Sequence, residues 1–449
     1  MRPARLYHSA LGQFALDLDC PQTHFDLLHH DQRGMAILWQ RGDASGNRWV
    51  KLRPNDPAIP DILRAREGIG DTYITPNEFD GWRAIRLLRS LRANYVDIDS
   101  QASLYDVLDL LATQRMPGPS AVLQSGRGLH LYWLLESLPP QTLPVWQRIQ
   151  DALIRALAPL GADPAAKDCT RLLRLSGTRN TKNGEEVIGC VLDGHRWSLR
   201  QLAFEVLGTE GRGIRPTATV RDLRAKRQAQ DRAMQGSIYA RWHLVFQDLM
   251  RISNHHHHAI PKGHRDKWLF LCGSALSWFT HPQGIEAEIA SLGRLHTDLD
   301  PSDYKDASTP NLKRALDAAA GKKMTWQGQS VDARYRFRRQ TLYDWMQPII
   351  PADLLPSLRA IIPDGLASER RTEREAARSP AREKTRAPRN RAIEGRYATN
   401  YTKTGVRSDN QEKRAQAQAM RAQGLSTRDI AVVCGVGKST VDRWCKSVP

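Results

Sequence analysis

Two aspartates stand two residues apart in the stretch YVDIDS, at residues 95–100. Asp97 and Asp99 alternate with apolar residues, which is typical of a strand, and side chains at i and i+2 of a strand point to the same face. Two carboxylates held that close repel each other unless a cation lies between them. The spacing therefore favours a pair of ligands for a divalent metal ion. A half-buried edge strand with an acidic face is the alternative that this stretch leaves open.

A second set of polar groups lies in the stretch LQSGRGLHLYWLL, which predicts two strands joined by a tight turn. Gly126 and Gly128 permit backbone angles that point successive N–H groups at one spot, and such a nest binds anions. Ser125 adds a hydroxyl, Arg127 adds a guanidinium, and His130 follows on the second strand. Together these groups could hold a triphosphate. A hairpin with a solvated arginine and a structural histidine fits the same residues equally well.

A third motif, GADPAAKDCTRLLRLSGTRN, supplies further carboxylates at Asp163 and Asp168. Arg171 and Arg174 are three residues apart in it, so they share a face if the segment is helical. On its own, the motif could also be a cluster of surface salt bridges.

In this order, with a helix between the second and the third, the three motifs resemble those of the archaeo-eukaryotic primase superfamily. The resemblance covers roughly residues 70–200 and is to the primase-polymerase branch, which includes replication primases of plasmids and integrative elements. It implies an RRM-like catalytic core with three metal ligands, Asp97, Asp99 and Asp163. Asp168 is the rival for the third position, and we favour Asp163. The resemblance further implies that His130 takes part in catalysis and that the nucleotide site consists of Ser125, Gly126, Arg127, Gly128, His130, Arg171 and Arg174. Ser176 stands where related primases commonly have a proline.

Three carboxylates are suited to a two-metal reaction. They can hold two Mg²⁺ or Mn²⁺ ions about 3.5–4 Å apart, and hard oxygen ligands suit these metals. Cationic and N–H groups around the phosphates would stabilise charge that grows in the transition state. The sequence thus predicts a DNA primase or primase-polymerase of a mobile genetic element. It would make short primers on a single-stranded DNA template from NTPs or dNTPs.

Two other functions use the same residues. A sequence-specific replication initiator or regulator with a degenerate core would bind origin DNA and polymerise nothing. A metal-dependent nuclease would use the carboxylates on DNA but would gain nothing from a turn that grips a triphosphate. The sequence decides neither the chemistry of the primer, RNA or DNA, nor the start site on the template. It contains no helicase motif, so we expect a separate helicase to act in trans.

The elements around the motifs predict an α+β catalytic domain over residues 1–212. Two strands at 35–40 and 47–52 form a hairpin, and DILRAREG and DGWRAIRLLRSLRA are expected to be helices. Further helices are expected at 103–115, 143–161 and 198–208, while residues 1–34 carry no clear pattern. The fold class predicted for the catalytic domain is therefore mixed helix and strand.

Residues 213–363 predict an all-helical accessory domain, with helices expected at 220–235, 239–253, 265–281, 284–296 and 311–321. Its GHRD stretch at 263–266 resembles the module that often follows a primase-polymerase core and grips template or primer. The run His255–His258 could suggest a metal site or the paired histidines of a nickase. An exposed turn fits better, because the run lies between RISN and IPKG and not on an apolar strand.

Residues 364–407 predict a basic, flexible linker, because the arginine-rich stretch at 364–395 has almost no large apolar side chains. Residues 408–449 predict a helix–turn–helix. GVGKST resembles a P-loop, but the required earlier glycine is replaced by Val432. Ser426 or Thr427 would cap the first helix, Gly435 would make the turn, and the expected core is Ile430, Ala431, Val436, Val441 and Trp444. The recognition helix would present Lys438, Ser439, Thr440 and Arg443 to duplex DNA, with a protein contact as the alternative.

The composition agrees with a nucleic-acid partner. The net charge is +18, which implies an acidic partner. The sequence has no run of 18 apolar residues and does not begin like a signal peptide, so we expect a cytoplasmic protein that binds no membrane. The six cysteines form no C-x-x-C pair, which argues against a disulfide framework and a zinc ribbon.

Overall fold

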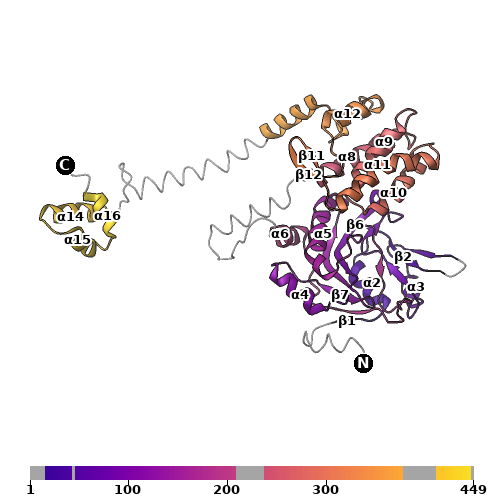
Figure 1. The fold of residues 1–449 in the computed structure, drawn as a ribbon, viewed down its shortest axis with the longest axis horizontal. Helices are drawn as coiled ribbons and strands as arrows, with labels where there is room; N and C mark the ends of the chain where they lie inside the picture. Colours follow the sequence, from indigo (N-terminus) through magenta and orange to yellow (C-terminus); the bar gives the residue numbers. More distant parts are fainter. Residues whose placement is uncertain (1–15, 43–45, 209–236, 378–410, 446–449) are drawn as a thin grey trace. The chain divides into compact units, whose positions relative to one another are not determined.

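The computed structural model describes residues 16–42, 46–208, 237–377 and 411–445. The chain divides into two compact units, Met1–Pro363 and Asp364–Pro449 (Figure 1). The helix predicted at 220–235 and residues 378–407 of the predicted linker lie outside the described residues.

The first unit contains a six-stranded antiparallel sheet. The order of its strands is β1 (Leu16–Leu18), β10 (Ile188–Val191), β7 (Ala121–Gln124), β8 (Leu129–Leu138), β6 (Leu88–Ile98) and β5 (Glu78–Phe79). The helices of this part are α2 (Pro21–His29), α3 (Ile59–Arg64), α4 (Leu104–Thr113), α5 (Leu143–Leu157) and α6 (Leu199–Leu207). α5 packs against β6, where the indole N–H of Trp146 donates to the carbonyl of Ala93 at 2.9 Å. The predicted α+β class of this part is confirmed.

Strand β6 corrects the helix predicted for DGWRAIRLLRSLRA. Residues 88–93 form the first half of the strand, in which Leu88 and Ser90 pair with β5 while Leu91 and Ala93 pair with β8. β6 lies between β8 and β5, and every residue except Arg89 is buried. The alternation of polar and apolar residues that marks a half-exposed strand is therefore missing from the sequence.

A second antiparallel sheet in the same unit has four strands. Their order is β3 (Arg48–Leu52), β2 (Ala36–Gln40), β4 (Thr72–Ile74) and β9 (Leu173–Arg174). The pairing of β2 with β3 confirms the predicted hairpin. Arg174 lies on β9 opposite Tyr73 of β4, so the shared helical face considered for Arg171 and Arg174 is wrong.

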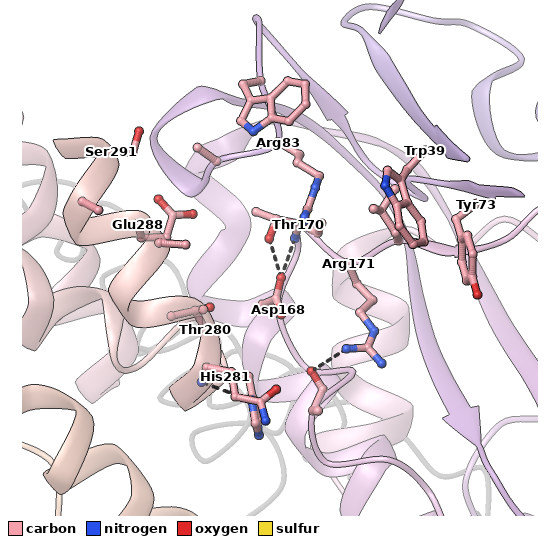
Figure 2. Close-up of a pocket in the computed structure, with 18 of the residues that line it drawn as sticks. Trp39, Tyr73, Arg83, Asp168, Thr170, Arg171, Thr280, His281, Glu288 and Ser291 are labelled. Atoms are coloured by element: carbon pink, nitrogen blue, oxygen red, sulfur yellow. Dashed lines mark hydrogen bonds between the residues drawn. The ribbon is translucent and has the colours of Figure 1, made fainter. Parts of the chain in front are cut away.

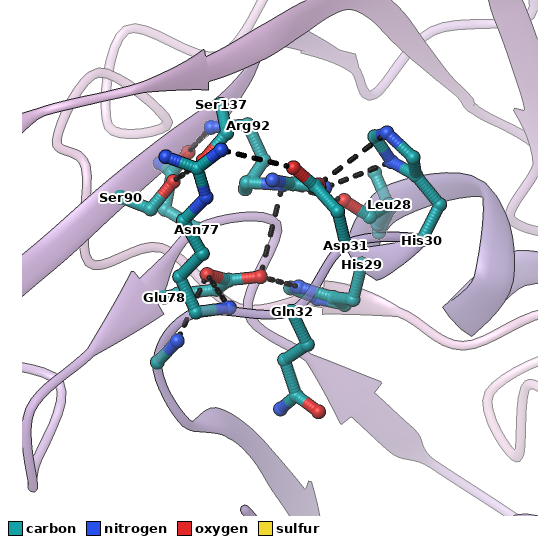
Figure 3. Close-up of polar contacts among 12 residues, drawn as sticks. Leu28, His29, His30, Asp31, Gln32, Asn77, Glu78, Ser90, Arg92 and Ser137 are labelled. Carbon is teal, nitrogen blue, oxygen red and sulfur yellow. Dashed lines mark hydrogen bonds and ion pairs between the residues drawn. The ribbon is translucent and has the colours of Figure 1, made fainter. Parts of the chain in front are cut away.

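A buried group of charges joins α2 to β5 and β6 (Figure 3). The side chain of Arg92 is fully buried, pairs with Asp31 and lies 3.7 Å from a carboxylate oxygen of Glu78. Glu78 is also fully buried, lies 3.2 Å from Nδ1 of His29 and accepts the backbone N–H of Gly34 at 3.1 Å. Each buried charge thus has a partner, which offsets much of the cost of removing it from water.

Residues 237–363 are mainly helical, as predicted. They form α8 (Ile238–His255), α9 (Arg265–Leu276), α10 (Pro282–His296), α11 (Pro301–Ala319) and α12 (Arg339–Met346). A hairpin of β11 (Lys323–Trp326) and β12 (Gln329–Asp332) is an element that the sequence did not indicate. α8 packs against α5, where the hydroxyl of Tyr239 donates to Asp151 at 2.6 Å. No helix of the described ranges is long and apolar enough to cross a membrane.

Asp248 of α8 holds the end of the first unit. Its side chain is fully buried, and one carboxylate oxygen accepts the backbone N–H groups of Arg359, Ala360 and Ile361 at 2.9, 2.6 and 3.0 Å. The histidine run ends the same helix: His255 is its last residue, and His257 and His258 are exposed with φ of 52° and 64°. The predicted exposed turn is confirmed for His257 and His258, whereas His255 is helical and His256 is half-buried.

The second unit begins with helical residues 364–377, which corrects the start of the predicted linker. Charged side chains with few large apolar residues disfavour a packed core, but they are compatible with an exposed helix. The C-terminal helices are α14 (Gln411–Ala422), α15 (Thr427–Cys434) and α16 (Lys438–Cys445). Ser426 caps α15, and Gly435 ends it with φ of 61°. The predicted core is confirmed and extended by Ala417 and Cys434.

Candidate metal and nucleotide site

Three carboxylates converge at the end of β6. Asp97 is the last residue but one of this strand and is buried, Asp99 follows the strand and is exposed, and Asp163 is half-buried. One oxygen of each lies within 4.8 Å of the others. Oxygen ligands at such separations are suited to one or two divalent ions of the Mg²⁺ or Mn²⁺ kind.

Main-chain pairing positions the third carboxylate. The N–H of Asp163 donates to the carbonyl of Asp97 at 2.7 Å, and the N–H of Asp99 donates to the carbonyl of Gly161 at 3.3 Å. Gly161 has φ of 82°, a left-handed conformation that favours glycine. The backbone, and not a chance arrangement of side chains, therefore brings the third motif to the end of β6.

Asp168 lies outside this group of carboxylates. Its carboxylate accepts the N–H and the hydroxyl of Thr170 at 3.0 and 2.5 Å, and the residue lines a neighbouring cavity. The geometry thus supports our preference for Asp163 as the third ligand.

Negative charge is costly at two of the three carboxylates, those of Asp97 and Asp99. Burial raises the pKa of Asp97 to about 6, and the carboxylate of Asp163 adds to this rise while Arg171 opposes it. Burial also raises the pKa of Asp99, together with the two neighbouring carboxylates. Carboxylates that resist ionisation together are stabilised by a bound cation, so the donor set fits a divalent metal.

Arg171 places a positive charge next to these carboxylates. Its Nη2 lies 2.8 Å from Oδ2 of Asp163 and 3.7 Å from Oδ2 of Asp97. The arginine is thus between the carboxylates and the cavity that it also lines. This position suits a group that would contact both the metal-binding carboxylates and the phosphates of a substrate.

His130 lies directly opposite Asp97 in the pairing of β6 with β8. Its Nε2 is 3.4 Å from Oδ1 of Asp97, and its buried Nδ1 has no hydrogen-bond partner. Burial lowers the pKa of His130 to about 3, with contributions from Arg174 and Arg171. The imidazole is therefore neutral at pH 7.

The glycines of the SGRGLH turn have different roles. Gly126 has φ of 114° and allows the turn, while the N–H of Ser125 closes it by donating to the carbonyl of Gly128 at 2.9 Å. Gly128 does not have positive φ; a Cβ there would lie 2.2 Å from the carbonyl oxygen of Ile98. This corrects the expectation that both glycines are needed for backbone angles. Arg127 is exposed beside them.

Arg174 has a different neighbourhood from Arg171. Its Nη1 lies 2.7 Å from Oδ1 of Asp71, and its guanidinium lies 4.9 Å from the ring centroid of Tyr73. Asp71 is buried and also accepts the hydroxyl of Thr181. Sequence reasoning missed Asp71, because no motif surrounds it and its partners are distant in the chain.

A cavity of 770 Å³ opens beside Arg171, between the four-stranded sheet and α10 (Figure 2). Trp39 and Tyr73 line it from the sheet, and Glu288 lines it from α10. One oxygen of Glu288 accepts the N–H of Ile85 at 2.9 Å, while the other is buried without a partner, and burial raises the pKa of Glu288 to about 7. No pattern in the sequence indicates Glu288, since it lies within an ordinary amphipathic helix.

On α16, the predicted recognition residues lie away from the core. Lys438, Ser439 and Arg443 are exposed and Thr440 is half-buried, whereas Val441 and Trp444 are buried. This arrangement suits contact with another molecule.

Several known proteins are similar to this chain. Residues 408–447 match the model of homeodomain-like domains. A replication protein of Clostridium perfringens is 27% identical over 174 residues, which are 36% of this chain and 40% of that protein. The AEP domain of the cyanophage S-2L primase-polymerase is 19% identical, with a TM-score of 0.33, and the match covers 41% of this chain and 95% of the domain. The primase RepB′ is 13% identical, with a TM-score of 0.27, over 67% of this chain and 93% of its own.

Over 36% of its length, the chain is thus similar to a replication protein. At its C-terminal end it has a homeodomain-like helix–turn–helix. It spans about two fifths of the length of the curated relative that it matches.

Proposed function

We propose that the first unit is a DNA primase or primase-polymerase that makes short primers on single-stranded DNA. The observation that carries this proposal is the meeting of Asp97, Asp99 and Asp163 within 4.8 Å, next to the SGRGLH turn, whose Gly128 lies against the carbonyl of Ile98. A nuclease would need the carboxylates alone, so the adjoining turn favours chemistry on a nucleoside triphosphate.

Each group of the site has a role in nucleotidyl transfer. Asp97, Asp99 and Asp163 would hold two Mg²⁺ or Mn²⁺ ions, which when bound would activate a 3′-hydroxyl and stabilise the departing pyrophosphate. Arg171 would turn from its carboxylate partners toward the phosphates, and the N–H groups of the SGRGLH turn would orient them. His130, being neutral, would donate one hydrogen bond to a phosphate oxygen without adding charge.

The second unit would direct this activity to particular DNA. A recognition helix fits the major groove of a duplex, and α16 exposes Lys438, Ser439 and Arg443. We propose that the protein serves the replication of a mobile genetic element and that a separate helicase supplies the unpaired template.

The direct test is synthesis on single-stranded DNA with labelled NTPs or dNTPs and Mn²⁺ or Mg²⁺. Asp99→Asn is the most informative variant, because Asp99 is exposed and its loss should leave the fold intact. We expect the rate to fall at least about 100-fold, since even changes to groups behind metal ligands cost 10–100-fold. Asp109→Asn, an exposed aspartate on α4, is the matched control and should retain full synthesis. Equal rates for the wild type and Asp99→Asn would refute the assignment.

A non-catalytic replication initiator is the second candidate, because Arg171 already neutralises part of the carboxylate group at 2.8 Å from Asp163. In that case the wild-type protein would bind DNA, make no product, and fail to bind Mn²⁺. Titration of Mn²⁺ followed by electron paramagnetic resonance distinguishes the two functions without depending on synthesis.

A further inference from the structure

One face of the four-stranded sheet has a row of aromatic side chains. Trp49 of β3 is directly opposite Trp39 of β2, which is opposite Tyr73 of β4, which in turn is opposite Arg174 of β9. Residues that are opposite in register point to the same face. Four strands therefore contribute one side chain each to a single line.

The rings of this row contact one another. The centroids of Trp39 and Trp49 are 6.0 Å apart and those of Trp39 and Tyr73 are 4.9 Å apart. Trp82 extends the row, with its centroid 4.8 Å from that of Trp49. The adjacent residues on the strands, Leu38 and Ile74, point to the opposite face and are buried there. The core is thus filled from that opposite face.

Much of the row is available to another molecule. Trp49 and Trp82 are 39% and 38% exposed, which is unusual for tryptophan. Trp39 and Tyr73 are half-buried and line the 770 Å³ cavity. Cations accompany the rings: the amino group of Lys51 lies 5.8 Å from the centroid of Trp82.

The row leads to the carboxylates. Arg171 lines the cavity together with Trp39 and Tyr73 (Figure 2). Its guanidinium also contacts Asp163 at 2.8 Å. At the end of the row, Arg174 is close enough to Asp97 to oppose the rise of its pKa. A strand lying on the rings would therefore end at the proposed metal site.

We propose that this aromatic row is the surface on which unpaired bases of single-stranded nucleic acid stack as they approach the carboxylates. The assignment rests on the proposed function, and it identifies where the template is held. Aromatic rings bind any base through its π-face, and nearby cations bind the phosphates. Since neighbouring strands are about 4.8 Å apart, the row has room for roughly two or three bases. A single nucleotide would require only one of these rings.

The test compares substitutions that keep or remove a ring at Trp49. Trp49→Tyr keeps a stacking face, whereas Trp49→Leu keeps an apolar side chain without one. Binding of the full chain to a fluorescein-labelled oligo(dT) is measured by anisotropy in EDTA, with excess unlabelled duplex DNA to occupy the second unit. We expect Trp49→Leu to weaken binding about ten-fold, which is within the range measured for loss of one stacked base, and Trp49→Tyr to weaken it less than about three-fold.

Tyr105→Leu is the control, because Tyr105 is 62% exposed on α4 and lies outside the row. It should bind oligo(dT) like the wild type. If Trp49→Leu and Trp82→Leu also bind like the wild type, the proposal is overturned, and the row is left as a surface for a protein partner. If Trp49→Leu and Trp49→Tyr are equally weakened, stacking is not the reason and the proposal fails as well.

The outcome is separable from that of the proposed function, because no metal or synthesis is involved. Photo-crosslinking of an oligonucleotide that contains 5-iodouracil, followed by peptide mapping, supplies an independent readout. Crosslinks at Trp49 or Trp82 support the row even if the protein synthesises nothing, and crosslinks confined to other regions refute it.

Discussion

Asp97 lies at the proposed metal site, and burial of its carboxylate lowers the stability of the metal-free protein. Burial raises its pKa to about 6, above the ordinary value of 3.8. Between these two values the folded protein binds a proton more tightly than the unfolded chain, so the contribution of this group to stability is present at low pH. It is lost as pH rises through about 6, unless a cation binds. The ionised carboxylate of Asp97 therefore destabilises the folded protein when no metal is bound.

We predict that Asp97→Asn stabilises the metal-free protein at pH 7 while it abolishes synthesis. The gain in unfolding free energy should be about 1–3 kcal/mol, since one pKa unit corresponds to about 1.4 kcal/mol, and it should vanish below pH 4. Urea denaturation followed by tryptophan fluorescence in EDTA measures it. A decrease in stability at pH 7 would show that the contacts of Asp97 with Arg171 and His130 outweigh the desolvation of the carboxylate.

Metal affinity should follow the same titration. Because a ligand must be deprotonated to bind a metal, Mn²⁺ binding should weaken as pH falls below about 6, approaching ten-fold per unit of pH. Isothermal titration calorimetry between pH 5 and pH 8 provides the measurement. An affinity independent of pH across this range would exclude Asp97 as a ligand.

At the scale of elements, the turn between β7 and β8 has no room for a side chain at Gly128. A Cβ there would meet the carbonyl of Ile98, the residue between Asp97 and Asp99. We predict that Gly128→Ala costs about 1–3 kcal/mol and greatly reduces synthesis, because the end of β6 must move. Gly118→Ala is the matched control, since its Cβ would have only an ordinary contact at 3.7 Å with Leu108. Similar thermal unfolding and activity in the two variants would contradict this view of the turn.

The buried charges between α2, β5 and β6 permit a second prediction at this scale. Arg92→Ala should destabilise the protein by about 3–5 kcal/mol, because it leaves Glu78 buried without its cationic partner. Arg89→Ala, three residues earlier on β6, removes an exposed arginine that is 3.7 Å from Asp80 and should cost less than about 0.5 kcal/mol. Chemical denaturation of both variants provides the comparison, and equal stabilities would contradict a structural role for Arg92.

How far the sequence could predict the fold depended on how local each signal was. The SGRGLH turn and the β2–β3 hairpin were predictable, because their glycines and apolar runs are adjacent in the chain. The first half of β6 was not predictable, because it is almost entirely buried and its buried Arg92 has its partners at residues 31 and 78, far away in the sequence. The sequence favoured Asp163 over Asp168 only by resemblance; the pairing of Asp163 with the end of β6 supplies the physical reason. The rings of the aromatic row come from three strands and from Trp82, so no single stretch indicates the row.

At the scale of the whole molecule, the two units suggest a division of labour. A primase requires an unpaired template, whereas a recognition helix binds duplex DNA. We predict that a chain ending at Pro363 retains primer synthesis on single strands but binds duplex DNA much more weakly. The log–log slope of binding against salt should shrink by roughly 0.9 for each phosphate that the shortened protein no longer neutralises. Parallel measurements on full-length and truncated protein test this, and an absence of synthesis on naked single strands would place the second unit in the catalytic machinery.

The three hydrogen bonds of Asp248 have a mechanical consequence. Any pull on the chain beyond Pro363 reaches the first unit through residues 358–362. Those residues are fastened by the N–H groups that Asp248 accepts and by the buried side chains of Leu358, Ile361 and Ile362. If the second unit stays on a duplex while the first advances along a template, tension would load α8 before it reached α5 and the strand that carries Asp97. A force transmitted from the DNA-bound second unit would thus act first on a helix that carries none of the three carboxylates.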